Sequence, residues 1–408
     1  MAKLLEGYKV IDLSTYVAAP TCARLFADWG AEVIKIEPPS GDVWRYFGVT
    51  AGCPATEEEN PIFDLYNANK KNLCLNLKKP EGKEIFFKLL EDADVFITNN
   101  RPQALRKMGI DYDSIKDRFP RLVYALLTGY GLDGPDKDDP GFDAVAYWSR
   151  SGSLADFAEA GGYPMVAPPA FGDASTGTAL FGGICAALLA REKTGKGDFV
   201  NNSLYGTAIW YGSMLSVVTQ PPYNDPYPKQ RYMVNPLVTN YKCSDGEWVM
   251  LCILQYDRFF RPLCEAIGAP QLADDPRFGS MELCMKNRKD LIDAFEAAFI
   301  QVDSATVCER LHAIDCVYGR LRHAKEVHND PQALANDNVR PFTFKSGRTI
   351  NMPVPPVKVG DAGLTPYEAA PLLGEHSVSI VKALGYSDEE VKKLVEEGAI
   401  VQNANSQK

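Results

Sequence analysis

The chain has 408 residues, of which 46% are hydrophobic and 24% are charged, and its formal net charge is −10 at pH 7. This size supports a large hydrophobic core and two or three domains. The acidic balance argues against nucleic-acid binding, because a polyanion would be repelled, so an anionic ligand would need a local basic pocket.

Targeting, membrane and disulfide patterns are absent from the sequence. Residues 1–14 have no apolar signal-peptide region and lead directly into a predicted strand. The longest nearly apolar run, residues 180–190, is too short to span a bilayer and predicts a buried helix. The ten cysteines form no C-x-x-C pair, which indicates neither a zinc site nor a disulfide framework. We therefore expect reduced core cysteines, no bound metal, no membrane partner and a cytoplasmic protein.

Strand and helix patterns alternate through the first 200 residues. Short β-branched runs predict strands, and the segments between them have helical spacing. The predicted strands are residues 8–14, 32–39, 72–77, 94–100 and 122–131, and the predicted helices are residues 19–31 and 80–93. Such alternation predicts an open parallel sheet with helices on its faces.

The carboxyl ends of these strands are where a parallel sheet binds its ligands. The segments at these ends are residues 14–20, 38–45, 75–78, 99–107 and 128–143. None contains the glycine pattern of a dinucleotide site or of a P-loop. The sequence therefore supports neither a hydride-transferring dehydrogenase nor a P-loop nucleotide enzyme.

The second half of the chain changes in character. Residues 216–240 are rich in Pro, Tyr and Asn and predict a long connection. The Asp-Gly pair at 245–246 predicts a hairpin turn, helical patterns fill 255–328, and a last helix begins with Ser387 as its cap. We predict an α/β protein with an open parallel-sheet large domain and a smaller α+β domain: residues 1–215 and 330–408 form the large domain, 216–240 the linker and 241–329 the small domain.

A single carboxylate, Asp173, stands between Gly172 and the small residues of "ASTG". By itself this pattern favours a helix N-cap, whose carboxylate accepts backbone N–H groups. The flanking Gly172 and Gly177 either let a substrate approach the backbone N–H groups or allow tight helix packing. These residues alone leave the structural and catalytic interpretations open.

Six segments, in order along the chain, carry a resemblance to one family. They are residues 10–45, 67–86, 94–115, 127–147, 172–177 ("GDASTG") and 371–400. Over nearly its whole length the chain resembles the class III (family III, CaiB/BaiF-type) CoA-transferases. Within that family it is most similar to the enzymes of amino-acid fermentation that transfer CoA to an (R)-2-hydroxy acid such as 2-hydroxyisocaproate or phenyllactate. The resemblance implies an α/β domain with a small domain, and two chains interlocked as a homodimer.

The resemblance also implies site residues. It makes Asp173 the nucleophile, which would carry CoA as an aspartyl thioester formed from an acyl-CoA. The CoA contacts that it implies fall on Val17, Ala18, Leu75, Lys78, Asn99, Asn100 and Lys107. Arg101 adds a basic side chain that suits a phosphate, although a solvated helix face gives the same pattern. CoA would enter as a substrate, so the partners are an acyl-CoA and a carboxylic acid, and no cofactor is expected.

Two other functions stay open. A 2-methylacyl-CoA racemase resembles the same segments, but Phe142 stands where its proton-accepting His would lie, and Phe accepts no proton. A non-catalytic acyl-CoA binder would keep the CoA contacts without needing Asp173. The substrates also stay unresolved, because the aromatic residues near the site would either line an acyl pocket or belong to the core: Tyr16, Trp44, Tyr46, Phe47, Phe142, Tyr147 and Trp148.

Overall fold

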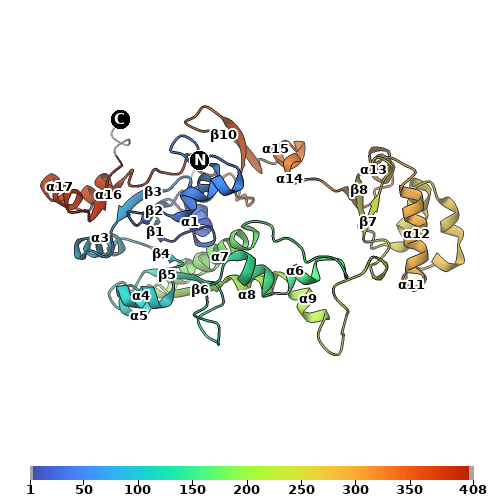
Figure 1. Ribbon diagram of the computed structural model, residues 1–408, viewed down its shortest axis with the longest axis horizontal. Coiled ribbons are helices and arrows are strands. Elements are labelled where there is room, and N and C mark those ends of the chain that lie inside the picture. Colours follow the sequence, from blue (N-terminus) through green and yellow to red (C-terminus); the bar gives the residue numbers. More distant parts are fainter. Residues whose placement is uncertain (1–2, 404–408) are drawn as a thin grey trace. The chain divides into compact units, whose positions relative to one another are not determined.

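The computed structural model describes residues 3–403, and the chain divides into two units (Figure 1). Unit 1 comprises the residues up to Ser153, Val166–Val217 and the residues from Pro331 onward, and unit 2 comprises Leu154–Met165 and Val218–Asp330. Residues 154–165, predicted to lie in the large domain, group with unit 2, because the Ala160 N–H donates to the Lys229 carbonyl oxygen at 2.9 Å.

Unit 1 is built on a seven-stranded sheet with the order β12-β3-β2-β1-β4-β5-β6. Six strands are parallel and β12 runs antiparallel to β3, which confirms the predicted large, mainly parallel sheet. The strands are β1 (Lys9–Leu13), β2 (Glu32–Glu37), β3 (Lys71–Leu75), β4 (Val95–Thr98), β5 (Val123–Thr128), β6 (Phe199–Ser203) and β12 (Ile400–Val401).

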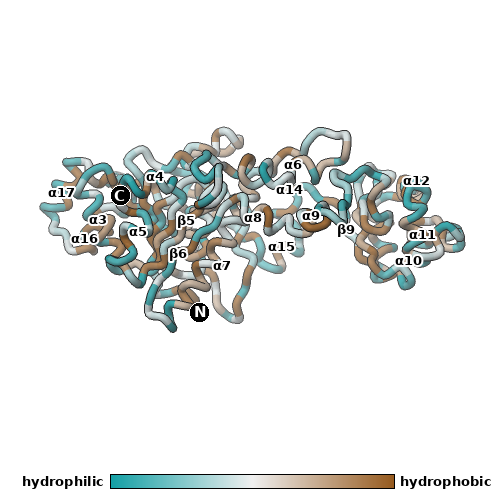
Figure 2. The backbone as a smooth tube through the Cα atoms, turned by 90° about the horizontal axis from the view of Figure 1, so that it is seen from below, coloured by the Kyte–Doolittle hydropathy of each residue, from teal (hydrophilic) through white to brown (hydrophobic). Residues whose placement is uncertain are grey.

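Helices cover both faces of this sheet, as its strands require. Val10 and Ile11 point to opposite faces of β1, and both are completely buried. Ile11 lies in a core with Phe86 of α3 and Val381 of α16, while α1 packs against α7. Figure 2 shows the hydrophobic residues along β5 and α7. The principal helices are α1 (Ala18–Asp28), α3 (Pro80–Glu91), α7 (Phe171–Thr194), α16 (Ser377–Ala383) and α17 (Asp388–Glu396).

Shorter elements connect these parts of unit 1. The predicted cap of the last helix is confirmed, since Ser387 and Glu390 form a capping box at the start of α17. The remaining elements are η1 (Val43–Ala51), α2 (Pro61–Asn67), α4 (Pro102–Met108), α5 (Tyr112–Ile115), η2 (Asp143–Ser149), α8 (Leu204–Tyr211), α9 (Ser213–Val218), α15 (Pro331–Ala335), β10 (Val339–Thr343) and β11 (Thr349–Pro353). Helix α6 (Ser153–Asp156) begins at the last residue of this segment of unit 1 and continues into unit 2.

The strand order reverses between β1 and β4. From β1 the chain builds β2 and β3 on one side, and it then crosses to build β4, β5 and β6 on the other side. Neighbouring strands whose connections leave in opposite directions open a crevice at their carboxyl ends. The residues after β1 and those after β4 therefore meet in this crevice.

Unit 2 has its own small sheet and core. Strands β7, β8 and β9 pair antiparallel, and Gly246 (φ +86°) lies in the turn between β7 and β8, which confirms the predicted hairpin. Tyr241, Phe260 and Phe295 are central in the core. The elements are β7 (Asn240–Lys242), β8 (Trp248–Leu251), β9 (Tyr318–Arg320), α10 (Tyr256–Ala266), α11 (Met281–Lys286), α12 (Arg288–Phe299), α13 (Ser304–Ala313), α14 (Ala324–Val327), η3 (Arg231–Met233), η4 (Pro270–Asp274) and η5 (Pro276–Phe278).

Helix α7 is unusually apolar for its burial. By length and composition it could cross a membrane, a test that the core helices of soluble proteins also pass. The buried helix predicted at residues 180–190 forms within it, yet only 28% of its most apolar window is buried. A large part of the α7 surface is thus left uncovered by this chain.

Candidate active site

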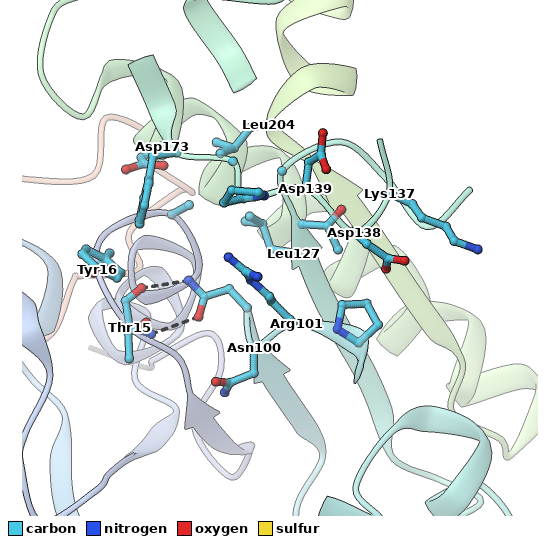
Figure 3. A pocket seen from close by; sticks show the side chains of 18 of the residues that line it. Thr15, Tyr16, Asn100, Arg101, Leu127, Lys137, Asp138, Asp139, Asp173 and Leu204 are labelled. Carbon is cyan, nitrogen blue, oxygen red and sulfur yellow. Dashed lines mark hydrogen bonds between the residues drawn. The ribbon is translucent and has the colours of Figure 1, made fainter. Parts of the chain in front are cut away.

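A cavity of about 240 Å³ opens at the carboxyl ends of β1, β4 and β5 (Figure 3). These strands are parallel, so the segments that follow them meet at one edge of the sheet. The side chains that matter for chemistry are Thr15, Tyr16, Ala18, Asn99, Asn100, Arg101, Lys137, Phe142 and Asp173. The cavity therefore joins the predicted nucleophile to several of the predicted CoA contacts.

Asp173 is the third residue of α7. The helix begins at Phe171, and Ala170, in the left-handed conformation (φ +60°), occupies the cap position. The interpretation of Asp173 as an N-cap is therefore wrong, because the helix starts two residues before it. Among the residues that the structure describes, no group donates a hydrogen bond to the half-buried Asp173 carboxylate, which lines the cavity.

The surroundings of Asp173 disfavour its charged form. Burial, and then the neighbouring Asp143 carboxylate, raise the pKa of Asp173 to about 7. A carboxylate that its environment stabilises poorly is more basic and a better nucleophile than one in water. The site therefore holds an acid that loses its proton near neutral pH.

Asp143, the second carboxylate, was not predicted as a site residue. Burial raises the pKa of Asp143 to about 6, against the opposing effect of the backbone N–H groups of Gly172, Asp173 and Ala170. A Cβ atom on Gly172 would lie 2.1 Å from Asp143 Oδ1, so only glycine allows this approach. The signal in the sequence was the acid within "PGFDAVAY", 30 positions from Asp173.

Tyr66 on α2 is a further neighbour that sequence reasoning missed. Burial, and then the charges of Asp173 and Asp143, raise the pKa of Tyr66 to about 12. Its ring centroid lies 6.4 Å from that of Trp44. The Tyr66 phenol thus stays protonated at neutral pH, close to both carboxylates.

The predicted CoA contacts fall into two groups. Ala18, Asn99, Asn100 and Arg101 line the cavity with Asp173. The other four lie outside it: Val17 and Leu75 are buried in the fold, and Lys78 and Lys107 are exposed basic side chains.

Asn99 and Asn100 use their side chains to join β4 to β1. Asn99 accepts from the Thr15 N–H at 3.0 Å and donates to the Thr15 carbonyl oxygen at 2.8 Å. Asn100 donates to the Leu13 carbonyl oxygen at 3.0 Å. These amides hold the crevice in shape, a role that the sequence did not reveal.

Gly177 lies at the contact between α7 and α1. A Cβ atom there would be 2.2 Å from the Ala18 carbonyl oxygen and 2.8 Å from Thr21 Cβ. This geometry supports the packing interpretation of Gly177, because close helix contact requires a residue without a side chain. Within residues 3–403, no group of three or more His, Cys, Asp or Glu side chains is arranged to hold a metal ion.

Comparisons with known proteins identify the family of this chain. The model of CoA-transferase family III matches residues 5–377. The chain is 41% identical over 392 residues to the (R)-2-hydroxy-4-methylpentanoate CoA-transferase of Clostridioides difficile, covering 96% of this chain and 98% of that protein. It is 36% identical over 394 residues to the cinnamoyl-CoA:phenyllactate CoA-transferase of Clostridium sporogenes, covering 96% of both chains.

Solved structures show the same fold. The crystal structure of a CAIB/BAIF family protein from Brucella suis superposes with a TM-score of 0.81 at 27% identity, over 94% of this chain and 100% of that one. Residues 5–377, which match the family model, include the crevice and the start of α7. The chain therefore belongs to CoA-transferase family III and is a CoA-transferase.

Proposed function

We propose that this enzyme moves CoA from an enoyl, branched or aryl acyl-CoA to an (R)-2-hydroxy carboxylic acid, through a thioester on Asp173. The observation that carries the mechanism is the Asp173 carboxylate, which lines the cavity without a hydrogen bond from the described residues and with a pKa raised to about 7. The substrate class is supported by the names of the two relatives, at 41% and 36% identity.

Asp173 would take part in two half-reactions, the first with the CoA donor and the second with the acceptor acid. Its carboxylate oxygen attacks the thioester carbonyl of the donor and the C–S bond breaks. CoA departs as a thiolate, and Asp173 and the donor acyl group are joined as a mixed anhydride. The thiolate then attacks the Asp173 carbonyl, which releases the donor as its free carboxylate and leaves an aspartyl-CoA thioester. In the second half-reaction the acceptor carboxylate attacks the aspartyl thioester and displaces CoA thiolate, which gives an anhydride of Asp173 and the acceptor. The thiolate then attacks the acceptor carbonyl, which forms the product acyl-CoA and restores the Asp173 carboxylate. Thioester energy is thereby kept, provided that water is excluded.

Asp143 would keep Asp173 reactive. The negative charge of Asp143 raises the pKa of Asp173. The backbone N–H groups at the start of α7 lower the pKa of Asp143 and so favour its charged form. The oxygen that becomes negative as the tetrahedral intermediates form needs donors, and the protonated Tyr66 phenol near both acids is one candidate. Gly172 is the residue that allows Asp143 to approach.

The CoA moiety would extend from Asp173 toward basic side chains. Arg101 and Lys137 line the cavity, and Lys137 lies on the far side from Asp173 in the view of Figure 3. Guanidinium and ammonium groups suit the phosphates of CoA. The predicted contacts at Val17, Leu75, Lys78 and Lys107, outside this cavity, stay predictions.

A homodimer is the proposed assembly. Apolar side chains are exposed on α8 and α9, including Trp210 at 77% and Met214 at 79% exposed. A surface of this kind in a soluble protein marks an interface. Sedimentation should give a mass twice the chain mass of 45.0 kDa. The double variant Trp210→Glu, Met214→Glu should sediment as a monomer. The control Val395→Glu, at an exposed position on α17, should remain a dimer. A monomeric wild type would contradict the dimer.

The two alternatives make different predictions. A racemase would exchange the α-proton of an acyl-CoA with solvent deuterium, and the exposed Phe142 at the cavity offers no base for this. A mere binder would show no turnover, and Asp173→Asn would bind CoA esters unchanged. The cytoplasmic location stays a prediction.

The substrate class is tested by turnover. Isocaproyl-CoA and cinnamoyl-CoA serve as donors for a panel of 2-hydroxy acids in both configurations, with oxalate and succinate as controls. The proposal expects transfer to bulky (R)-2-hydroxy acids. Activity with oxalate alone would contradict the substrate class while leaving the CoA-transferase in place.

A further inference from the structure

Tyr16 has a strained backbone at the wall of the cavity. It lies three residues beyond the end of β1 at Leu13 and adopts φ +63°, the left-handed region. This conformation is uncommon for a bulky residue and persists only where its surroundings hold it, most often at functional sites. The fold therefore maintains Tyr16 in this geometry against its own preference.

Two side chains hold the backbone at this point. Asn99 binds both the N–H and the carbonyl group of Thr15, the preceding residue. The Tyr16 N–H donates to Asp42 Oδ1 at 3.2 Å. The two peptide groups that precede the strained residue, between residues 14 and 15 and between residues 15 and 16, are thereby fixed.

Asp42 is itself anchored in the core. Its Oδ2 lies 3.0 Å from Lys35 Nζ, and both side chains are completely buried. Its Oδ1 also accepts from the Trp44 N–H at 3.0 Å. One buried carboxylate therefore positions Tyr16 and Trp44 together, and removing it would take away the ion-pair partner of the buried Lys35.

The rings form a continuous aromatic wall. Tyr16 meets Phe142 edge to face with the ring centroids 5.0 Å apart, and the ring centroids of Trp44 and Tyr16 lie 6.4 Å apart. Phe142 is 56% exposed although it lines the cavity, so it is not a core residue. Such an exposed aromatic edge is suited to a planar apolar group.

The cavity has an apolar and a polar side. In Figure 3, Tyr16 lies near Asp173, whereas Lys137 and Asp138 lie on the opposite side. With the CoA phosphates near Lys137, on the side away from Asp173, the acyl group at Asp173 would face Tyr16 and Phe142. The aromatic wall is thus placed beside the reacting carbonyl.

We propose that Tyr16, held by Asp42 and backed by Phe142 and Trp44, is a specificity-determining residue whose ring packs against the acyl side chain of the donor and selects a planar aromatic one. This inference rests on the proposed function. It adds the substrate feature that the sequence left unresolved, because an aromatic ring gains more from this wall than a short chain does.

The test compares kcat/KM for cinnamoyl-CoA, isocaproyl-CoA and propionyl-CoA with one acceptor. Tyr16→Asn is the informative variant, because Asn tolerates the left-handed conformation and removes the ring. We expect a loss of about 10–100-fold with cinnamoyl-CoA and about threefold or less with propionyl-CoA. Tyr16→Phe should retain the preference, and Tyr46→Ala, an exposed aromatic outside this cavity, should leave all three values unchanged.

Each outcome decides a separate point. Equal losses for all three donors, or a wild type that prefers propionyl-CoA, would overturn the role of Tyr16. Phe142→Ala, measured in parallel, should also lower kcat/KM more for cinnamoyl-CoA than for the other two donors. Unchanged binding of free CoA verifies the fold of each variant. A wild type that transfers CoA from no donor would instead refute the proposed function.

Discussion

Gly172 and Asp143 are in such close contact that a Cβ atom on Gly172 would lie 2.1 Å from Asp143 Oδ1 and 2.4 Å from Tyr147 Cγ. The absence of a side chain at the second residue of α7 is what admits a carboxylate to the start of that helix. Asp173 follows Gly172 directly, so the two acids become neighbours. Burial raises the pKa values of both, and the Asp143 charge raises the pKa of Asp173 further.

The acid pair predicts how stability depends on pH. Both folded-state pKa values, about 6 for Asp143 and about 7 for Asp173, lie above the ordinary value of 3.8. The stability that these groups contribute is thus complete below about pH 4 and lost as pH rises through 6 to 7. Asp173→Asn should raise the free energy of unfolding by about 1–3 kcal/mol at pH 8 and by almost nothing at pH 4. Urea unfolding at both pH values checks this, and a gain that is equal at both would contradict it.

The pair also predicts the pH dependence of activity. Asp173 must be deprotonated to attack, so kcat/KM should rise with pH up to about 7. Asp143→Asn removes the neighbouring charge and should move this acid limb down by about 0.5–1 pH unit. Asp139→Asn changes an exposed acid that also lines the cavity and should not move the limb. A limb that stays in place in Asp143→Asn would show that the two acids do not interact.

Arg101 predicts an electrostatic contribution to CoA binding. Arg101→Ala should raise KM for the acyl-CoA by about 5–20-fold with little change in kcat, because phosphate contacts remote from the reacting carbonyl act on binding. The effect should shrink in high salt. Lys116→Ala, an exposed cation paired with Asp113 outside the cavity, is the matched control. Equal effects of both variants would indicate general charge rather than a phosphate site.

Much of the fold could be predicted because the sheet follows simple periodicity. The five predicted strands of unit 1 all form, and the helix predicted at 19–31 ends a little early, at Asp28, before Gly30 with φ +98°. Two strands of the seven-stranded sheet escaped prediction. The sequence of β6, "FVNNS", is too polar to suggest a strand, and the two residues of β12 are recruited by pairing with β3.

The site was harder to predict because its residues meet only in the folded chain. Asp143 and Tyr66 are far from Asp173 in the sequence, and no local pattern links them. Lys35 lies in the strand "EVIKIE", where a lysine suggests solvent exposure, yet it is fully buried against Asp42. Periodicity detects apolar burial, whereas a buried ion pair depends on a partner that the strand pattern does not reveal.

The most direct test of the mechanism is to trap the covalent intermediate. The enzyme is incubated with isocaproyl-CoA or cinnamoyl-CoA, treated with borohydride, which reduces an aspartyl thioester to an alcohol, and analysed by peptide mass spectrometry. The mechanism predicts that Asp173 is converted to the alcohol, that Asp143 is unmodified, and that Asp173→Asn shows no such product. An unmodified Asp173 in enzyme that demonstrably binds the CoA ester would contradict the proposed mechanism.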